Sequence, residues 1–400
     1  MSAMLTLEEA QARLLALAEP LPVERVDVPG ALGRYLAEPL KARRTQPSSD
    51  LSAMDGYAVR SADIAGPWRV IGESAAGHPF AGQVGAGEAV RIATGALMPA
   101  GADAVVLQED IARDGDQAAL TGTPPSPAGR HVRHCGADFC IDCQLLPEGA
   151  RIGPAQLALA LAAGHNHLAV RRPPRIAIID SGDELASDPE RCAPHQIPAS
   201  NGAMLAALVA GLPGMVTRLG PVRDNLSALT AALDAAGEAD VIVTTGGASV
   251  GDHDLIRPAL AAWGAELDFW KVSIKPGKPL LVARRGRQIV LGLPGNPVSS
   301  HVTAMLFLLP LLRALSGAGS PLPRPIMLRL AAPLPPGGAR REFLRGSIGD
   351  DGVTMLTTQD SGALAAMAAA DCLIDRLPHA PAATAGAEVA AYLLQNGGSA

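Results

Sequence analysis

Apolar and polar residues alternate with different periods along the chain. The segments 1–40 and 154–164 carry apolar side chains at helical spacing. Residues 46–138 instead combine short β-branched runs with frequent glycine and proline, which is typical of β-hairpins and loops. We therefore expect a β-rich insertion, 46–138, within an elongated, largely helical domain made of residues 1–45 and 139–171.

A second pattern begins at residue 172. Short apolar runs, which read as buried strands, alternate there with segments of helical periodicity. The expected strands and helices follow one another at 176–179, 202–211, 215–219, 226–237 and 240–247 and, after the short strands LLVA and QIVLGL, at 297–315. Strands that alternate with helices predict a parallel, doubly wound sheet, here within residues 172–322.

Short strands resume after residue 322, in the segments 325–334, 341–348, 353–358 and 388–394. They predict a small β-rich C-terminal domain, 323–400. A chain of 400 residues is long enough for two to four domains. The predicted fold class is therefore multidomain α/β, with a central, mostly parallel sheet.

Composition and charge narrow the possible partners. The chain is 48% hydrophobic and carries a formal net charge of −6, which argues against broad electrostatic binding to nucleic acid or an anionic membrane. The N-terminal segment contains Glu8 and Glu9 and reads as an amphipathic helix rather than a secretory signal. The longest apolar run, 304–312, contains Pro310 and is shorter than the roughly 20 residues of a membrane helix. We expect a cytoplasmic protein.

Three of the five cysteines have a notable spacing. Cys135, Cys140 and Cys143 match the C-x4-C-x2-C part of a plant-type iron–sulfur site, and two histidines are close by. Such a site needs a fourth ligand, and neither of the two remaining cysteines belongs to a similar local motif. Reduced thiols on a loop are the favoured interpretation, and an iron–sulfur or zinc site is the less favoured one.

Lysine is concentrated in one short segment. Of 33 basic Lys and Arg residues only four are lysines, so 33 − 4 = 29 are arginines, yet Lys271, Lys275 and Lys278 lie within eight residues. Lysine offers a compact, flexible point charge that suits binding and release of a phosphate or tetrahedral oxyanion. We predict that Lys271 and Lys275 face such an anion, and that Lys278 shapes the proline-rich loop.

Glycine-rich segments follow the predicted strands of the central sheet, where ligands bind in open α/β folds. Gly246 and Gly247 would let backbone N–H groups approach a phosphate closely, although a tight turn explains the pair equally well. Ser299 and Ser300 are candidates to cap the helix after PGNP. A Walker A loop is excluded because Lys278 precedes a proline, and no G-x-G-x-x-G motif opens a helix.

Three acids follow strands of the same sheet: Glu184, Asp224 and Asp254. Each alone is explained as a helix cap or a solvated loop residue. Together, on the same rim as the lysines, they indicate a magnesium site completed by substrate phosphates. In the β-rich insertion, Asp55 in SAMDGYAV and Thr94 in RIATG form another polar cluster, which β-turns would also explain.

In sequence order these segments resemble the molybdopterin molybdenumtransferase family, whose eukaryotic members include the matching part of gephyrin. The resemblance runs from about residue 5 to 395. It is carried by SAMDGYA (52–58), RIATGALMPAGADAVV (91–106), GDEL (182–185), TTGGASVGDHD (244–254), FWKVSIKPGKP (269–279), GLPGNPVSS (292–300) and QDSGAL (359–364). Each motif alone is weak, but the ordered set is specific.

The resemblance implies a reaction and an assembly. Molybdate is inserted at the dithiolene of adenylylated molybdopterin, AMP is released, and magnesium is required. The subunits are elongated, and two of them form a homodimer whose active site lies between the central domain of one and the insertion of the other. A molybdopterin adenylyltransferase, which makes the substrate, is a possible partner protein.

The resemblance also assigns residues. Catalytic roles fall to Asp55, Thr94, Glu184, Asp224, Asp254, Lys271 and Lys275, with Asp55 and Thr94 facing the site from the partner and Glu184, Asp224 and Asp254 holding the metal. Together with the strand-end pattern, it implies substrate binding by Asp138, Ser181, Gly182, Gly246, Gly247, Ser249, Gly251, Pro294, Gly295, Asn296, Pro297 and Ser299.

The sequence departs from the family pattern before the predicted helix at residue 202. It reads IPASN there, keeping Asn201 but lacking the acid found in many members. Two rival functions remain: a molybdopterin-binding scaffold without turnover, and a molybdopterin adenylyltransferase. The adenylyltransferase family has a single domain of well under half this length, and the complete set of acids and lysines argues against a pure scaffold. The sequence does not distinguish molybdate from tungstate as the preferred oxyanion.

Overall fold

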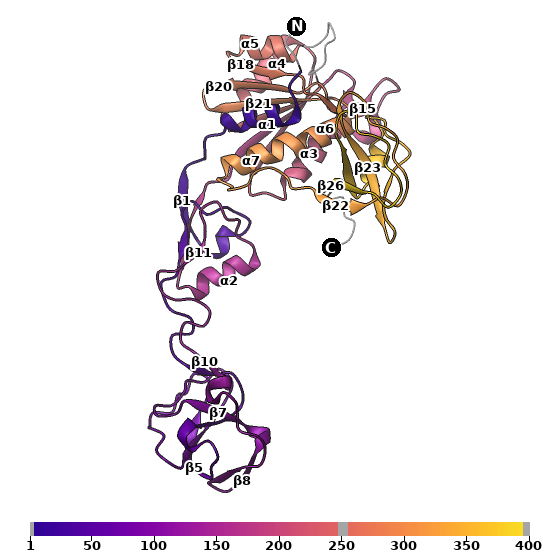
Figure 1. The fold of residues 1–400 in the computed structure, drawn as a ribbon. Coiled ribbons are helices and arrows are strands. Elements are labelled where there is room, and N and C mark those ends of the chain that lie inside the picture. Colours follow the sequence, from indigo (N-terminus) through magenta and orange to yellow (C-terminus); the bar gives the residue numbers. More distant parts are fainter. Residues whose placement is uncertain (1–3, 247–254, 395–400) are drawn as a thin grey trace.

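The computed structural model describes residues 4–246 and 255–394. Within them, three six-stranded sheets lie in separate parts of an elongated molecule. Figure 1 shows the central sheet and the C-terminal sheet side by side at one end, and the β-rich insertion at the other. A narrow stalk joins the two ends.

The central sheet confirms the predicted doubly wound arrangement. Its strand order is β16-β13-β17-β21-β20-β18. The first four strands are parallel, and β20 is antiparallel to both of its neighbours. The strands are β13 (Arg175–Ser181), β16 (Met215–Val222), β17 (Val241–Thr245), β18 (Glu266–Trp270), β20 (Leu281–Arg285) and β21 (Gln288–Leu293).

Helices cover both faces of this sheet because its buried strands present apolar side chains in both directions. Ile176 and Ile178 pack on one face, and Ala177 and Ile179 pack on the other. The first face is covered by α1 (Leu7–Ala16), α3 (Asn201–Val209), α6 (Pro297–Thr303) and α7 (Leu309–Leu315), and the second by α4 (Leu226–Ala235) and α5 (Ile256–Ala262).

The helix predicted at 297–315 is continuous from α6 to α7. A π-turn, η6 (Ala304–Leu308), joins the two and leads into Pro310, which lies at the start of α7 and has no N–H to donate. By length and composition, Pro297–Leu315 is the one helix among the described residues that could cross a membrane. However, 89% of that stretch is buried inside the fold, as in a core helix.

The expectation of helix throughout the first forty residues is wrong beyond Ala16. Thr6 caps α1 by accepting the Glu9 N–H at 3.2 Å, but Pro20 and Pro22 follow the helix. The chain then forms β1 (Val23–Asp27), which pairs antiparallel with β12 (His167–Arg171). Pairing with a distant strand outweighs the local helical pattern here. Helix α2 (Pro154–Ala162) lies beside this ribbon in the stalk (Figure 1).

The insertion is a mostly antiparallel sheet, in the order β7-β4-β6-β5-β9-β8. Its strands are β4 (Gly56–Val59), β5 (Trp68–Ser74), β6 (Glu88–Ile92), β7 (Ala104–Leu107), β8 (Ile111–Asp114) and β9 (Gln117–Leu120). The chain enters and leaves through two short antiparallel pairs: β2 (Leu40–Lys41) with β11 (Gln144–Leu146), and β3 (Leu51–Ser52) with β10 (Val132–Arg133).

The C-terminal sheet includes one strand from the central region. Strand β19 (Ile274–Lys275) pairs parallel with β23 (Arg341–Gly349) and so anchors the lysine-rich loop to this sheet. The other strands are β22 (Ile326–Arg329), β24 (Gly352–Met355), β25 (Cys372–Arg376) and β26 (Glu388–Leu393). The remaining short elements are β14 (Leu185–Ala186), β15 (Ile197–Pro198), α8 (Leu364–Ala368) and 3-10 turns at Pro29–Ala31, Ser61–Asp63, Gln108–Asp110, Ala128–His131 and Pro189–Arg191.

Candidate functional site

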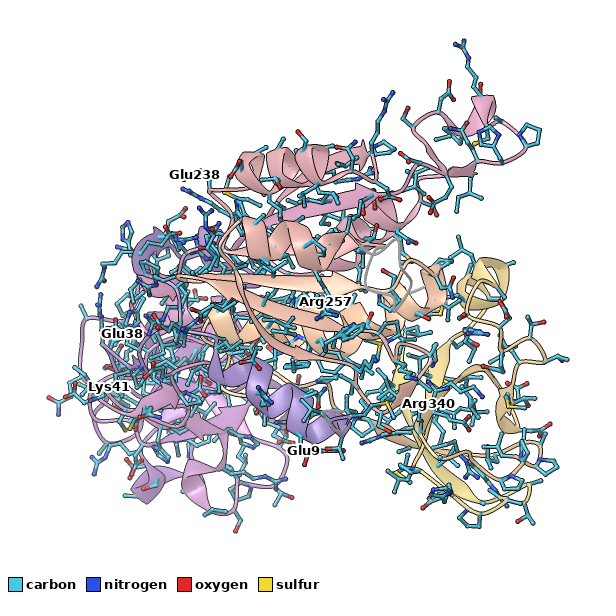
Figure 2. All side chains as sticks on the ribbon, turned by 90° about the horizontal axis from the view of Figure 1, so that it is seen from above. Glu9, Glu38, Lys41, Glu238, Arg257 and Arg340 are labelled. Carbon is cyan, nitrogen blue, oxygen red and sulfur yellow. The ribbon has the colours of Figure 1, made fainter. Side chains whose placement is uncertain are left out.

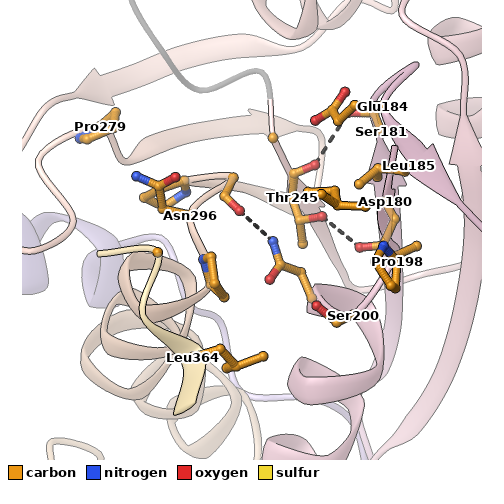
Figure 3. A pocket seen from close by; sticks show the side chains of 18 residues that line it. Asp180, Ser181, Glu184, Leu185, Pro198, Ser200, Thr245, Pro279, Asn296 and Leu364 are labelled. Atoms are coloured by element: carbon orange, nitrogen blue, oxygen red, sulfur yellow. Dashed lines mark hydrogen bonds between the residues drawn. The ribbon is translucent and has the colours of Figure 1, made fainter. Parts of the chain in front are cut away.

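A cavity of about 760 Å³ opens at the carboxyl edge of the central sheet. This is where ligands bind in open α/β sheets. Figure 3 shows Asp180 and Glu184 on one side of the cavity and Pro279 and Asn296 on the other. Its lining comprises Asp180, Ser181, Glu184, Leu185, Ile197, Pro198, Ala199, Ser200, Asn201, Thr245, Gly246, Pro279, Pro294, Gly295, Asn296, Pro297, Gly362 and Leu364.

The ends of three parallel strands, β13, β17 and β21, approach one another closely in this cavity. Gly246 follows β17 with φ +90°, and a Cβ there would lie 2.8 Å from the Ser181 carbonyl oxygen. A Cβ on Gly295, which follows β21, would be 3.5 Å from the Gly246 Cα. Gly246 is therefore required by both backbone conformation and space. Its predicted neighbours Gly247, Ser249, Gly251 and Asp254 lie outside the described residues.

A hydrogen-bond network forms the floor of the cavity around Asp180. The Thr245 hydroxyl donates to Asp180 Oδ1 at 2.6 Å, and the Gly202 N–H also donates to this carboxylate. Burial raises the pKa of Asp180, against the opposing effects of Thr245 and of Arg218 at 3.8 Å. The network ties β13 and β17 to the start of α3.

Asn201, the residue that the sequence keeps from the family pattern, extends this network to β21. Its Nδ2 donates to the Gly295 carbonyl at 2.7 Å, and the Ser181 hydroxyl donates to the Thr245 carbonyl at 3.4 Å (Figure 3). Sequence reasoning did not select Asp180. The available signal was an acid at the end of the otherwise apolar run IAIID.

An acidic rim lies beside the cavity. Burial of its carboxylate raises the pKa of Asp224, and the nearby charges of Glu184 and Asp183 raise it further. The Asp224 N–H donates to Asp183 Oδ1 at 3.3 Å. A Cβ on Gly182 would lie 2.5 Å from Glu184 Oε2, so the glycine lets that side chain fold back.

These carboxylates fit a divalent cation that a ligand helps to hold. A bound cation would relieve the repulsion between the Asp224 carboxylate and the charges of Glu184 and Asp183. Mg²⁺ commonly binds one or two carboxylates together with substrate phosphates. Among the described residues, no three His, Cys, Asp or Glu side chains are grouped closely enough to hold a metal ion by themselves.

Lys271 lies at the same edge of the sheet as the cavity. Because β20 is antiparallel to both β21 and β18, β18 and β21 end at the same edge, and Lys271 directly follows β18. Its φ of +83° is unusual for a residue other than glycine and is the kind of strain that occurs at functional sites. Its Nζ lies 4.1 Å from the centroid of the Trp270 ring. The guanidinium carbon of Arg257, which Figure 2 labels, lies 4.5 Å from the same centroid.

Lys275 and Lys278 have different surroundings. Lys275 Nζ donates to Glu342 Oε1 at 2.9 Å and therefore points toward the C-terminal sheet. Lys278 is exposed. Neither of these lysines nor Lys271 lines the cavity, although Pro279 of the same loop does.

The start of α6 forms one wall of the cavity. Asn296 is the N-cap residue and Pro297 occupies the first helical position. Ser299 and Ser300 were expected to cap the helix, but both are buried within it. Ser361, which sequence reasoning did not select, meets this helix instead. Its carbonyl accepts the Val298 N–H at 3.1 Å and its hydroxyl accepts from Asn296 Nδ2 at 2.8 Å.

Asp55 and Thr94 form a local pair in the insertion. Asp55 Oδ1 accepts the Thr94 N–H at 2.6 Å and the Thr94 hydroxyl at 2.9 Å, and these bonds lower the pKa of Asp55. Asp138 lies in the stalk, where its N–H donates to the Gln46 carbonyl at 3.0 Å. The insertion is at the far end of the molecule from the cavity, so one chain does not bring Asp55 and Thr94 to the cavity (Figure 1).

The cysteines Cys135, Cys140 and Cys143 are free and exposed in the stalk. The Cys135 N–H donates to Asp50 Oδ1 at 2.8 Å, and Asp50 Oδ2 lies 3.1 Å from His134 Nδ1. The motif is thus part of a hydrogen-bonded loop.

Family models match almost the whole chain. They are the MoeA N-terminal region (domain I and II) at residues 5–164, a probable molybdopterin binding domain at 177–314, and the MoeA C-terminal region (domain IV) at 327–394. A molybdopterin molybdenumtransferase of Nostoc sp. is 38% identical over 305 residues, or 74% of this chain and 70% of that one. Its counterpart in Haemophilus influenzae is 35% identical over 318 residues, 78% of each chain.

The chain belongs to the molybdopterin molybdenumtransferase family. Solved structures of the family share the complete architecture. A crystal structure of the molybdopterin biosynthesis MoeA protein of Pyrococcus horikoshii has a TM-score of 0.79 at 30% identity and covers 98% of this chain and 99% of its own. A second structure from that organism gives a TM-score of 0.83 at 27% identity, with 98% and 100% covered. The central sheet and most of the cavity lining fall within the probable molybdopterin binding domain, and Gly362 and Leu364 come from the MoeA C-terminal region.

Proposed function

We propose that this chain inserts molybdenum into adenylylated molybdopterin, releasing AMP and forming molybdenum cofactor. The observation that carries the proposal is the cavity at the carboxyl edge of the central sheet, with the acidic rim beside it and Lys271 at the same edge. The names of the relatives support the reaction type. Molybdate is the co-substrate in this proposal.

The cavity suits a large ligand that carries phosphoryl groups. Its volume of about 760 Å³ is within the range of small-molecule sites. The Gly246 turn and the PGNP loop bring backbone close to the ligand, and we assign to this surface the predicted substrate-binding residues that line the cavity: Ser181, Gly246, Pro294, Gly295, Asn296 and Pro297. Gly182 and Ser299, which were also predicted to bind substrate, do not line the cavity, and Ser299 is buried within α6. In this proposal Asn201 and Asp180 hold the surface in place.

Release of AMP requires neutralisation of negative charge on phosphoryl oxygens. We assign that role to Lys271 and Lys275, whose flexible side chains would bind phosphate or molybdate. Glu184 and Asp224 would hold Mg²⁺, which supplies further positive charge to the phosphoryl oxygens when it is bound. A nucleophilic side chain is not required, because the incoming oxyanion is a substrate.

The proposed site is shared between two copies of the chain. Thr94 donates two hydrogen bonds to Asp55, yet the two residues lie at the far end of the subunit from the cavity. A second copy in a homodimer would bring its insertion, including Asp55 and Thr94, to the cavity of the first, and we keep Asp138, in the stalk, as a predicted substrate-binding residue. We also propose that a molybdopterin adenylyltransferase delivers the substrate.

The test is AMP release by the purified protein. Incubation with adenylylated molybdopterin, magnesium and molybdate should release AMP, and omission of the oxyanion is the control. Tungstate in place of molybdate measures oxyanion preference. If the protein binds adenylylated molybdopterin without oxyanion-dependent AMP release, the enzyme proposal is wrong and a scaffold role replaces it.

A further inference from the structure

A second cavity, of about 550 Å³, lies where the stalk, the central region and the C-terminal sheet meet. Its lining includes Tyr35 from the stalk, the end of α3, the helix at 297–315, the linker at 320–326 and the end of β26. None of its lining residues belongs to the cavity at the sheet edge. Nothing in the proposed molybdenum chemistry uses this second cavity.

The charged residues around the second cavity are all arginines. Arg151, Arg313 and Arg324 line it, and its lining contains no Asp or Glu. No carboxylate among the described residues forms an ion pair with any of the three. The guanidinium groups donate hydrogen bonds to neutral oxygens. Arg313 Nη1 donates to the Pro321 carbonyl at 3.2 Å, and Arg324 Nη2 donates to the Ser320 hydroxyl at 3.3 Å. Arg151 Nη2 likewise donates to the Gly211 carbonyl at 3.1 Å.

The interior of the second cavity is mainly apolar. Leu208, Leu212, Met305 and Leu309 contribute to its walls. His301 also lines it, with 6% of the residue exposed, and its Nδ1 has no hydrogen-bond partner among the described residues. Burial lowers the pKa of His301 to about 4, so this imidazole is uncharged at neutral pH.

The three arginines of the cavity are more exposed than the apolar side chains on its inner wall. Arg151 and Arg324 are exposed and Arg313 is half-buried, whereas Met305 and Leu309 are buried. The three cationic groups are therefore nearer the mouth, together with the exposed Leu322, Ile326 and Leu393, and Met305 and Leu309 are nearer the interior. An occupant that matches both parts has an apolar body and an anionic head, because guanidinium groups pair well with carboxylates and phosphates.

We propose that the second cavity binds a small amphipathic organic anion, with its apolar chain or ring against Leu208, Met305 and Leu309 and its carboxylate or phosphate head at Arg313 and Arg324. A neutral or cationic amphiphile would leave the arginines without a counter-charge. The proposal does not depend on the molybdenum chemistry, so either can fail without the other.

The probe for this site is 8-anilinonaphthalene-1-sulfonate, which has an apolar ring system and one anionic group. Its fluorescence should report one saturable site per full-length chain. Octanoate and octyl phosphate should displace it, and comparison of the two distinguishes a carboxylate from a phosphate preference. Octanol and octylammonium, which share the chain but lack the negative charge, should compete at least about tenfold less well.

Two substitutions and a matched control locate the site. Arg313→Gln should raise the Kd of the probe about tenfold, and Arg324→Gln, at an exposed position that folding tolerates, should raise it severalfold. Arg287→Gln is the control, because Arg287 is an exposed arginine that pairs with Glu19 at 2.9 Å and is outside the cavity. It should leave the Kd unchanged.

Three results would overturn the proposal. They are absence of saturable binding, equal competition by octylammonium and octanoate, or an unchanged Kd in both cavity variants. A fourth would replace it. If the probe binds only when the protein is dilute, and Arg313→Gln weakens self-association in analytical ultracentrifugation, then the cavity is a contact between copies.

Discussion

Lys275 Nζ lies 2.9 Å from Glu342 Oε1, and this ion pair joins the lysine-rich loop to the C-terminal sheet. The strand register places the two residues directly opposite each other. The side chain of Lys275 is 54% exposed and that of Glu342 is 12% exposed. Glu342 is thus the more buried residue of the pair. Loss of Lys275 would leave the Glu342 carboxylate without its counter-charge and would therefore lower stability.

We predict that Lys275→Ala lowers AMP release by at least about 100-fold, as expected when a group that stabilises transition-state charge is removed. It should lower stability by no more than about 1 kcal/mol, since the lysine is half exposed. Glu342→Gln should keep activity. The double variant Lys275→Ala/Glu342→Gln should recover the melting temperature but not AMP release.

Lys278→Ala is the control for that series, because Lys278 is exposed on the same loop, and it should remain active. Recovery of AMP release in the double variant would show that Lys275 serves only to balance Glu342.

The shared site is tested by mixing two inactive variants. Asp55→Ala and Lys271→Ala alter opposite ends of the subunit, so the proposed heterodimer contains one site with both changes and one with neither. After co-refolding at equal amounts, half of the dimers are mixed and half of their sites are intact, so activity should reach about a quarter of wild type. Activity that stays at the level of the single variants would mean that one chain supplies the complete site.

Glu184→Gln and Asp224→Asn should each raise the magnesium concentration that gives half-maximal AMP release, since each removes a proposed oxygen ligand. The pKa of Asp224 is raised by burial and by Glu184 and Asp183, so without metal this carboxyl gains a proton at a higher pH than an ordinary aspartate. The magnesium requirement of the wild type should therefore increase as the pH falls.

Asp224→Asn should flatten this pH dependence. Asp188→Asn, at an exposed acid that pairs with Arg191 at 3.5 Å, should not. If Glu184→Gln and Asp224→Asn require the same magnesium concentration as the Asp188→Asn control and the wild type, then Glu184 and Asp224 do not hold the metal.

Asp180→Asn should raise the melting temperature at neutral pH. Burial raises the pKa of Asp180 in the folded state. The protonated carboxyl therefore contributes stability that is fully present below the unfolded pKa, about 3.9, and is lost as the pH rises through the folded-state pKa. In the variant, the asparagine Nδ2 can donate to the Thr245 hydroxyl, which reverses the bond that Asp180 accepts, and the asparagine oxygen can accept the Gly202 N–H without a buried charge. The gain should be about 2–4 °C at pH 7, and it should disappear near pH 4 in thermal unfolding followed by circular dichroism. A lower melting temperature at pH 7 would show that the ionised carboxylate stabilises the fold.

The sequence predicted the central sheet well because a parallel sheet is buried on both faces. Its strands are continuous apolar runs, such as the one within β13, and the helices between them carry apolar residues at helical spacing. The rule that ligands bind at the carboxyl edge also selected Ser181, Gly246 and the PGNP loop, which do line the cavity. Their roles in binding remain predictions, as do the domain limits.

The features that were missed depend on contacts between distant segments. Glu342 meets Lys275 across 67 residues, and Ser361 meets Asn296 across 65. Local periodicity does not reveal such pairs. The same reason explains why the N-terminal forty residues were expected to be helical, since β1 exists only through its pairing with β12.

The two short strand pairs of the stalk make the β-rich insertion a separable module. Strand β3 enters and β10 leaves it side by side, so residues 51 and 133 are adjacent partners. A short turn could therefore replace everything between them without disturbing the rest of the chain. Evolution could have acquired, exchanged or lost this module through a single insertion point, while the sheet that carries the cavity stayed unchanged.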